Sequence, residues 1–422
     1  MDAAVVDRVS AAEPDWRASA RRRALVHFDE LEMPSQSDEV WKYVSLDFDL
    51  DDYRLVSEPG PGGDGGLAGL TPARRVLVVD GIGTAASGAD DGVWVGSLED
   101  AMAVRAAVVE AAESRGVPAD LDRFAAAHRA FGGGGALVHV DRAAVSGTVL
   151  VEFVTATPGA VSFPRLLVVT EDAAEASVIV YSRSEPGVDA LVVPHVEVLA
   201  GAASNVSVSV IQNLGRRMRS IGHTRAVIGR DASLTFAEAG LGGLLSRLHL
   251  TVDLEGRGSS AAIVGAYFGD RDQILDYRYF MHHAGLDTRS DMFLKGAVED
   301  TALSVFTGLI RIDEGAQRTD AFQTNRNLIL SEGAAAQSVP NLEILANDVR
   351  CGHGSTVGPL DAEQRYYLMS RGIEPERADR LQVRGFFEEA LARFPHREVV
   401  VPLREWMNAK FVEAQEEGRV RT

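Results

Sequence analysis

The feature that most constrains the fold is a long series of short β-branched segments between residues 136 and 358. Turns rich in Gly, Asp, Ser and Asn separate these segments, and few helical patterns lie between them. Strand patterns this dense predict an all-β region. The segments are Val149–Val154, Leu166–Val169, Ala176–Tyr181, Leu191–Leu199, Asn205–Ile211, Thr224–Ile228, Ser233–Glu238, Arg247–Leu254, Ala261–Tyr267, Ile274–Phe280, Ala302–Ile312 and Asn327–Leu330.

A sandwich, a barrel and a β-helix would all satisfy this pattern. A corner of Gly or acidic residues, followed by small residues and a strand, recurs at Gly229, Gly256, Asp313 and Ser331. Such a recurrence is typical of a coil repeated along an axis. The region is also long for one sandwich, whereas a solenoid grows by adding coils. We therefore predict a β-helix core over residues 136–358.

Residues 1–135 have a helical and mixed pattern. Trp16, Ala24, Phe28 and Leu31 recur at helical spacing. Ser97 with Asp100 three residues later resembles a capping box. We predict helices over 14–33, 97–113 and 119–131, a short aromatic segment at 39–43, and an exposed loop over 57–72.

A strand pattern at 75–80 runs into Gly81-Ile-Gly-Thr-Ala-Ala86, which superficially matches the dinucleotide-binding fingerprint. That fingerprint requires a helix next, and residues 87–92 are turn residues instead. We therefore expect a plain surface loop there. The chain contains no Gly-Lys-Ser/Thr sequence, so we predict no P-loop for a nucleotide.

The last region, residues 359–422, is predicted to be helical. Asp361 is a plausible N-cap and Gly372 a helix stop, and further helices are expected over about 374–394 and 402–417. These short helices carry many apolar residues. They must either pack on the β-helix or present an apolar face to a partner.

Composition limits the function classes. The formal net charge of −19 argues against nucleic acid or an anionic membrane as a partner. A single cysteine excludes an internal disulfide and a site of several thiolates within the chain. The first residues do not resemble a signal peptide, and no apolar run is long enough to span a membrane. We expect a cytoplasmic, reducing location.

Cys351 and His353 form the candidate site. Residues i and i+2 on a strand share a face, and a thiolate with an imidazole can ligate iron. Two ligands cannot hold a cluster alone, so a second chain would have to complete the site. The alternative is structural: a small buried Cys351 and a polar His353 at a strand end.

The other histidines have weaker signals. His282 and His283 are adjacent, so on a strand they point to opposite faces, and we expect a turn or surface role for them. His195, His223 and His249 are scattered over predicted strands, and we assign them no role.

Several blocks in order resemble the SufB/SufD family, the scaffold proteins of the Suf iron–sulfur cluster assembly system. The resemblance is strongest from about 280 to 395 and looser in the N-terminal third. The blocks are Leu31–Pro34, Glu39–Tyr43, Ser290–Gly296, Phe306–Ile310, Pro340–Ile344, Asp348–Gly354 and Tyr367–Ile373.

Within the family the chain resembles SufD. SufB carries a glutamate at the position of Gly354 and an essential cysteine at the position aligned with Asn325. The resemblance implies a right-handed parallel β-helix, a heterodimer with SufB through the β-helix ends, and binding of the ATPase SufC through the C-terminal helices. It implies a non-catalytic subunit, with ATP on SufC, and a homodimer is also possible.

The resemblance also implies roles for individual residues. His353 would face the SufB cysteine and ligate iron or a nascent Fe–S cluster shared with SufB, and Cys351 is the less certain ligand. No cofactor is expected to bind stably to this chain alone, and flavin is possible in the complex. The candidates for SufC docking are Tyr367, Phe386, Phe387 and Trp406.

Two other functions remain as alternatives. One is a β-helix enzyme acting on acidic polysaccharide, although the sequence lacks an obvious cluster of acidic and basic residues for that chemistry. The other is a standalone homodimeric iron-binding protein, which iron-dependent absorbance of the isolated chain would support.

Overall fold

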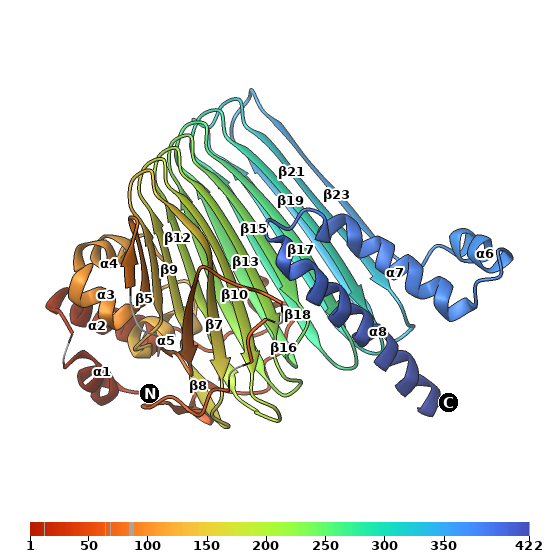
Figure 1. Cartoon of the computed structure of the whole chain (residues 1–422), viewed down its shortest axis with the longest axis horizontal. Coiled ribbons are helices and arrows are strands. Elements are labelled where there is room, and N and C mark those ends of the chain that lie inside the picture. Colours follow the sequence, from red (N-terminus) through yellow and green to blue (C-terminus); the bar gives the residue numbers. More distant parts are fainter. Residues whose placement is uncertain (12, 64, 68, 84–87, 422) are drawn as a thin grey trace.

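The computed structural model describes residues 1–11, 13–63, 65–67, 69–83 and 88–421. Its centre is a solenoid of parallel strands that alternate between two sheets, with helices at both ends of the chain (Figure 1). The predicted parallel β-helix is therefore confirmed. Sheet A contains, in spatial order, β22 (Ala335–Ile344), β20 (Leu303–Ile312), β18 (Ile274–His283), β16 (Leu245–Leu254), β14 (Arg219–Ile228), β12 (His195–Ala200), β9 (Arg165–Thr170), β6 (Ala136–Val140), β5 (Val93–Ser97) and β4 (Gly88–Asp90). The short strands β1 (Arg54–Leu55), β8 (Ala160–Ser162) and β11 (Leu191–Val192) extend sheet A beside its main path.

Sheet B forms the facing wall of the solenoid. The order of sheet B is β23 (Arg350–Gly358), β21 (Asp320–Ile329), β19 (Arg289–Val298), β17 (Ser260–Gly269), β15 (Ser233–Gly240), β13 (Asn205–Asn213), β10 (Glu175–Ser184), β7 (Val145–Thr155), β2 (Arg74–Val79) and β3 (Ile82–Gly83).

Successive coils stack in register. One coil takes about thirty residues, the length over which a solenoid repeats its contacts. The corner after each sheet A strand from β6 to β20 contains a residue with a left-handed backbone, which explains the recurring turn signature. The first residues of the paired sheet B strands are Glu175, Asn205, Ser233, Ser260, Arg289, Asp320 and Arg350. The corner residues with positive φ are Ala143, Ala173, Ala203, Asp231, Gly258, Asp287 and Arg318.

Two glycines of the predicted signature are required by close backbone approach. A Cβ on Gly229 would lie 2.7 Å from the carbonyl oxygen of Ala200, one coil earlier. A Cβ on Gly256 would lie 2.1 Å from the backbone nitrogen of Arg230. Side chains at these two corners would therefore push the coils apart.

Apolar side chains from both sheets fill the solenoid interior. Val178, Val208 and Phe236 are fully buried at inward positions of neighbouring sheet B strands. Burial of one such side chain stabilises the fold by about 1.5–3 kcal/mol. Toward the C-terminal end the inward positions become polar, with Gln323 and Asn325 on β21.

The N-terminal region covers the outer face of the early coils of sheet A (Figure 1). Trp41, Phe28 and Phe124 pack there against Ile221 and Leu245 of the solenoid. The elements are α1 (Ala3–Ser10), α2 (Asp15–Glu30), η1 (Glu39–Trp41), η2 (Leu50–Asp52), α3 (Leu98–Val104), α4 (Ala106–Glu113) and α5 (Arg123–Phe131).

The structure corrects several predicted helix boundaries. The helix expected over 97–113 is interrupted at Arg105, whose φ of −134° and ψ of 28° are not helical. The helix expected over 119–131 begins only after its N-cap Asp122, whose carboxylate accepts from the Ala125 N–H at 2.8 Å. Helix α1 was not predicted. The predicted cap Ser97 is confirmed, because its side chain accepts from the Asp100 N–H at the start of α3.

The strand at 75–80 does not open a nucleotide-binding unit. After β2 the chain turns back through Gly81, and β3 pairs with β2 in the antiparallel direction. Residues 84–87 of the glycine pattern lie outside the described residues. The part that is described therefore supports rejecting the dinucleotide fingerprint, which needs a helix at this point.

Three helices follow the solenoid: α6 (Ala362–Ser370), α7 (Pro375–Leu391) and α8 (Val400–Arg421), with η3 (Arg397–Val399) before the last. Helices α7 and α8 lie across the outer face of sheet B, whereas α6 projects away from the solenoid (Figure 1). None of the helices that the structure describes is long and apolar enough to cross a membrane.

Candidate functional site

The terminal coil, made of β22 and β23, ends both sheets. The Arg350 N–H donates to the Thr319 carbonyl oxygen at 2.9 Å, so this residue points its backbone groups toward β21. Because backbone groups of a parallel strand alternate in direction, those of Cys351 and His353 point to the open edge. An edge of this kind is a template for a strand of another chain.

The two edges of the terminal coil differ. On β22, Ala335 and Leu345 donate toward β20, so residue 340 points its backbone to the open edge. That residue is Pro340, which has no N–H to offer. The edge of β22 is therefore interrupted in its middle, whereas β23 contains no proline over its nine residues.

Cys351 and His353 lie on the face of β23 that looks into the solenoid, as their spacing predicts. Cys351 pairs in register with Ala321 and packs against the interior core, while His353 pairs with Gln323. The Cys351 side chain is partly buried and the His353 side chain is exposed. The open coil therefore presents the imidazole at its mouth and the thiol a little deeper.

The two candidate ligands differ in how readily each side chain could bind a metal ion. Burial raises the pKa of the Cys351 thiol, although its hydrogen bond with the Gly352 backbone opposes the shift. Only the thiolate ligates metal, so Cys351 must first be deprotonated, and its partly buried position disfavours deprotonation. His353 already lies at the surface, where a partner's metal ion could reach its nitrogen atoms.

A buried polar network that was not predicted lies in the solenoid interior, one coil before the open terminal coil. The Asn325 amide donates to the Tyr267 hydroxyl at 3.1 Å, and the Asn327 amide donates to Asn325 Oδ1 at 2.6 Å. The Tyr267 hydroxyl in turn donates to Asn327 Oδ1 at 2.7 Å. Asn325 is thus fixed by hydrogen bonds at the position where SufB is expected to carry a cysteine.

Helix α6 is the most exposed element of the C-terminal region. Its N-terminus is capped by Asp361, whose carboxylate accepts from the N–H groups of Glu363 and Gln364. None of its residues is buried, and Tyr366 and Tyr367 are 75% and 57% exposed. Of the four docking candidates, Tyr367 is therefore the one that lies openly on the surface.

The other three candidates pack on the solenoid to different degrees. Phe387 is 3% exposed and packs against Phe268, and Trp406 stacks on Tyr181 with ring centroids 5.9 Å apart. Phe386 is half-buried, and the Lys295 ammonium lies 4.4 Å from its ring centre. For Phe387 and Trp406 the first of the two expected arrangements, packing on the β-helix, is the one observed.

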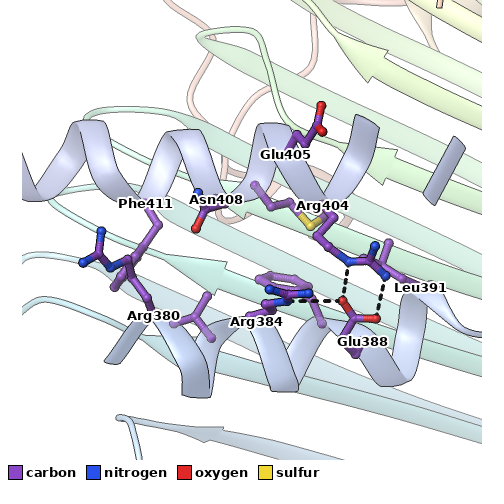
Figure 2. A pocket seen from close by; sticks show the side chains of 11 residues that line it. Arg380, Arg384, Glu388, Leu391, Arg404, Glu405, Asn408 and Phe411 are labelled. Atoms are coloured by element: carbon purple, nitrogen blue, oxygen red, sulfur yellow. Dashed lines mark hydrogen bonds and ion pairs between the residues drawn. The ribbon is translucent and has the colours of Figure 1, made fainter. Parts of the chain in front are cut away.

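A groove of about 230 Å³ runs between α7 and α8 (Figure 2). Its floor contains Phe387 and Phe411, and Arg380 and Arg384 lie along it. Arg404 makes a two-pronged ion pair with Glu388 at 2.5 and 2.9 Å. This pair ties α8 to α7, so the two helices form one unit on sheet B.

The histidines to which no role was assigned form a column on the outer face of sheet A. His195, His223 and His249 are neighbours in register on β12, β14 and β16. His128 of α5 stacks on His195 with ring centroids 3.4 Å apart. Burial lowers the pKa of His249 to about 3. The signal in the sequence was a spacing close to one coil, which places residues of successive strands side by side.

His282 and His283 point to opposite faces, as expected, but the surface role predicted for His283 is wrong. His283 is fully buried in the interior and contacts the hydroxyls of Thr288 and Ser290, each at 2.8 Å. His282 lies half-buried on the outer face, between the carboxylates of Asp253 and Asp313. Buried hydroxyl partners from the following corner allow an inward histidine.

Comparison with known proteins places this arrangement in a family. Residues 153–386, more than half of the chain, match the family model described as SUF system FeS cluster assembly, SufBD core domain. The iron–sulfur cluster assembly protein SufD of Bacillus subtilis is 30% identical over 283 residues, which cover 66% of this chain and 65% of that protein. SufD of Escherichia coli is 34% identical over 167 residues, or 40% of each chain.

Mycobacterial proteins have a higher percentage identity than these two SufD proteins. An iron–sulfur cluster assembly SufBD family protein of Mycobacterium leprae is 39% identical over 207 residues, 47% of this chain and 53% of its own length. A SufBD family protein of Mycobacterium tuberculosis is 37% identical over 249 residues, 57% of this chain and 62% of its own. The match thus spans less than two thirds of these relatives. The chain belongs to the SufBD family of SUF-system iron–sulfur cluster assembly proteins and is SufD-like.

Proposed function

We propose that this chain is a non-catalytic scaffold subunit that pairs with SufB through its terminal coil. The observation that carries the proposal is the unpaired backbone edge of β23, with His353 exposed beside it. A strand from a partner would satisfy the outward N–H and C=O groups of β23. The same pairing would bring the partner's side chains to the mouth of the solenoid.

His353 is proposed as the ligand that this chain contributes to iron or a nascent cluster at that seam. A neutral imidazole nitrogen ligates iron without first losing a proton. Cys351 is the weaker candidate because its thiol is partly buried and its pKa is raised. SufB would supply the remaining ligands, and the metal is cargo of the assembly rather than a resident cofactor.

We further propose that the C-terminal helices bind SufC, which would hold the ATP. The exposed Tyr366 and Tyr367 of α6 are suited to contact a partner. Phe387 and Trp406 would act indirectly, by fixing α7 and α8 on sheet B. The cytoplasm, which is reducing, is the proposed location of the complex.

Copurification under anaerobic, reducing conditions tests the pairing. Tagged chain is expressed with the SufB and SufC homologues of the same genome, and the expected result is a complex containing all three. Recovery of the folded chain without either homologue would contradict the proposal. Recovery as a dimer of this chain alone, with iron-dependent absorbance, would favour the homodimeric iron-binding alternative.

A further inference from the structure

A second metal-ligand cluster lies near the N-terminal end of the solenoid. His139 on β6 and Asp141 just after it lie on the same outer face, because they are two residues apart. Glu171 follows β9 and continues the register in which Val140 pairs with Thr170, so it neighbours Asp141. Among the described residues, His139, Asp141 and Glu171 are the group whose ligand atoms all lie within 4.8 Å of one another.

One ring nitrogen of the histidine in this cluster lacks a hydrogen-bond partner. His139 is 3% exposed, and its Nδ1 atom is buried without a hydrogen bond. Nδ1 lies 3.5 Å from Asp141 Oδ1, and Nε2 lies 3.8 Å from Glu171 Oε1. Buried polar nitrogen atoms are usually satisfied, so the buried Nδ1 without a hydrogen bond, in a ring that has a carboxylate beside each nitrogen, points to a missing ligand.

The charges around the cluster favour a cation. Asp141 and Glu171 are directly neighbouring carboxylates on adjacent coils, an arrangement that repels unless a positive charge lies between them. Glu171 Oε2 accepts from the Arg142 N–H at 3.0 Å, and the Arg142 guanidinium pairs with Asp172 instead.

His282 provides an internal comparison. It also lies between two carboxylates, but its Nδ1 is 3.1 Å from Asp253 Oδ1 and its Nε2 is 2.9 Å from Asp313 Oδ2, both hydrogen bonds. The hydrogen bond with Asp253 is the main cause that raises the pKa of His282. In that cluster both ring nitrogens are hydrogen bonded to carboxylates, whereas in the His139 cluster the buried Nδ1 has no hydrogen bond.

We propose that His139, Asp141 and Glu171 bind one divalent transition-metal ion. One imidazole nitrogen and one oxygen from each carboxylate would be the ligands, and water would fill the remaining positions on the half-exposed side. Metal–ligand bonds of about 2.0–2.2 Å fit ligand atoms this close after small side-chain rotations. Mixed nitrogen and oxygen ligands suit ions such as Fe²⁺, Co²⁺, Mn²⁺ or Zn²⁺.

The ion would join two successive coils, since Asp141 and Glu171 belong to neighbouring turns of the solenoid. The site is separate from the terminal coil, because β6 lies near the β4 end of sheet A, whereas the terminal coil lies at the other end of both sheets, at β22 and β23. Binding should therefore survive the loss of Cys351 and His353.

The test uses the full chain with Mn²⁺, followed by EPR, and with Co²⁺, followed by its visible absorption. We expect one ion per chain, and binding at least about tenfold weaker in Asp141→Asn and in Glu171→Gln, because each removes one of three ligands. Asp172→Asn and His282→Gln are matched controls that should bind like the wild type. The Cys351→Ser/His353→Ala double variant should also bind normally.

Three outcomes would overturn the site. They are no Mn²⁺ or Co²⁺ binding by the folded wild-type chain at millimolar metal, equal binding by the Asp141 and Glu171 variants, or loss of binding in the Cys351/His353 double variant. The two carboxylates are half-exposed, so these variants should fold normally even if His139→Gln does not. Thermal unfolding supplies an independent readout, because a bound ion should raise the Tm of the wild type and not of Asp141→Asn.

Discussion

The two ends of the solenoid solve the problem of unpaired strand edges in different ways. At the N-terminal end the sheets finish in antiparallel strands of only two and three residues, β3 and β4, and helices cover the outer face of sheet A. At the C-terminal end β22 and β23 keep ten and nine residues with one open side. One end therefore finishes in short strands beside covering helices, whereas the other finishes in long strands with an unpaired edge.

The largest expected contrast comes from proline on a central and on a terminal strand. Ser207 lies on β13, which is paired on both sides, so Ser207→Pro removes a ladder hydrogen bond and should abolish folding. Ser355 points its N–H to the open edge of β23, so Ser355→Pro should fold. It should also lose most of its association with SufB, because the missing donor belongs to the edge a partner would use.

Circular dichroism and copurification measure this contrast. If Ser355→Pro binds SufB as well as the wild type does, the edge of β23 is not the pairing surface. If Ser207→Pro folds normally, the assignment of β13 to the interior of the sheet is wrong.

The next contrast compares an aromatic residue from each end. Phe124 is fully buried between Trp41 and Phe48, so Phe124→Ala should lower the free energy of unfolding by about 3–5 kcal/mol. Tyr367 is exposed on α6, so Tyr367→Ala should change it by no more than about 0.5 kcal/mol. Urea unfolding gives both values. A large loss in Tyr367→Ala would show that α6 is packed and not free for a partner.

A smaller effect is expected from the candidate ligands. His353→Ala should leave stability and association unchanged but slow cluster formation by the assembled complex severalfold, because one ligand at the seam is lost. Cys351→Ser should have the weaker effect, since its thiol is partly buried and its pKa is raised. Anaerobic reconstitution followed by absorbance measures the rate. An unchanged rate in His353→Ala would remove this residue from the proposed site.

The last contrast is the pH dependence of stability that His249 contributes beneath the N-terminal helices. Burial holds the pKa of His249 at about 3, so the folded state keeps this ring neutral while the unfolded state binds a proton below its ordinary pKa of about 6.5. The contribution of the neutral ring to the free energy of unfolding is fully present above pH 6.5 and is lost as the pH falls toward 3. His249→Asn should flatten that slope. Thr251→Ala, which removes the neighbouring hydroxyl but no titrating group, should retain the wild-type slope.

Local patterns predicted the solenoid and an open last coil near residue 350, but they did not mark the individual strands of that coil. The β-branched runs and Gly corners are short-range signals, and the strands they mark are present. Strands β19, β22 and β23 were absent from the predicted segments because charged, small or proline residues dilute their alternation, as in Arg350–Gly358. Their assignment depends on hydrogen bonds to a strand one coil earlier, which no local window contains.

The candidate sites likewise include features that follow from local sequence and features that depend on contacts between coils. The shared face of Cys351 and His353 follows from their spacing alone. The histidine column and the Asp141–Glu171 pair depend on residues about one coil apart, and they become visible only once the register is known. The burial of Phe387 and Trp406 likewise depends on where α7 and α8 dock, which their apolar stripe does not specify.

The two ends also differ in where a further strand could extend the solenoid along its axis. Among the described residues, β22 and β23 are the long strands with an unpaired edge, so a partner strand that extends either sheet would add beyond them. Pairing at this end alone would join two chains end to end and would not continue into a fibre. Pro340 also makes the two edges of such a junction unequal, because the continuous edge of β23 offers a partner more consecutive hydrogen bonds than the interrupted edge of β22.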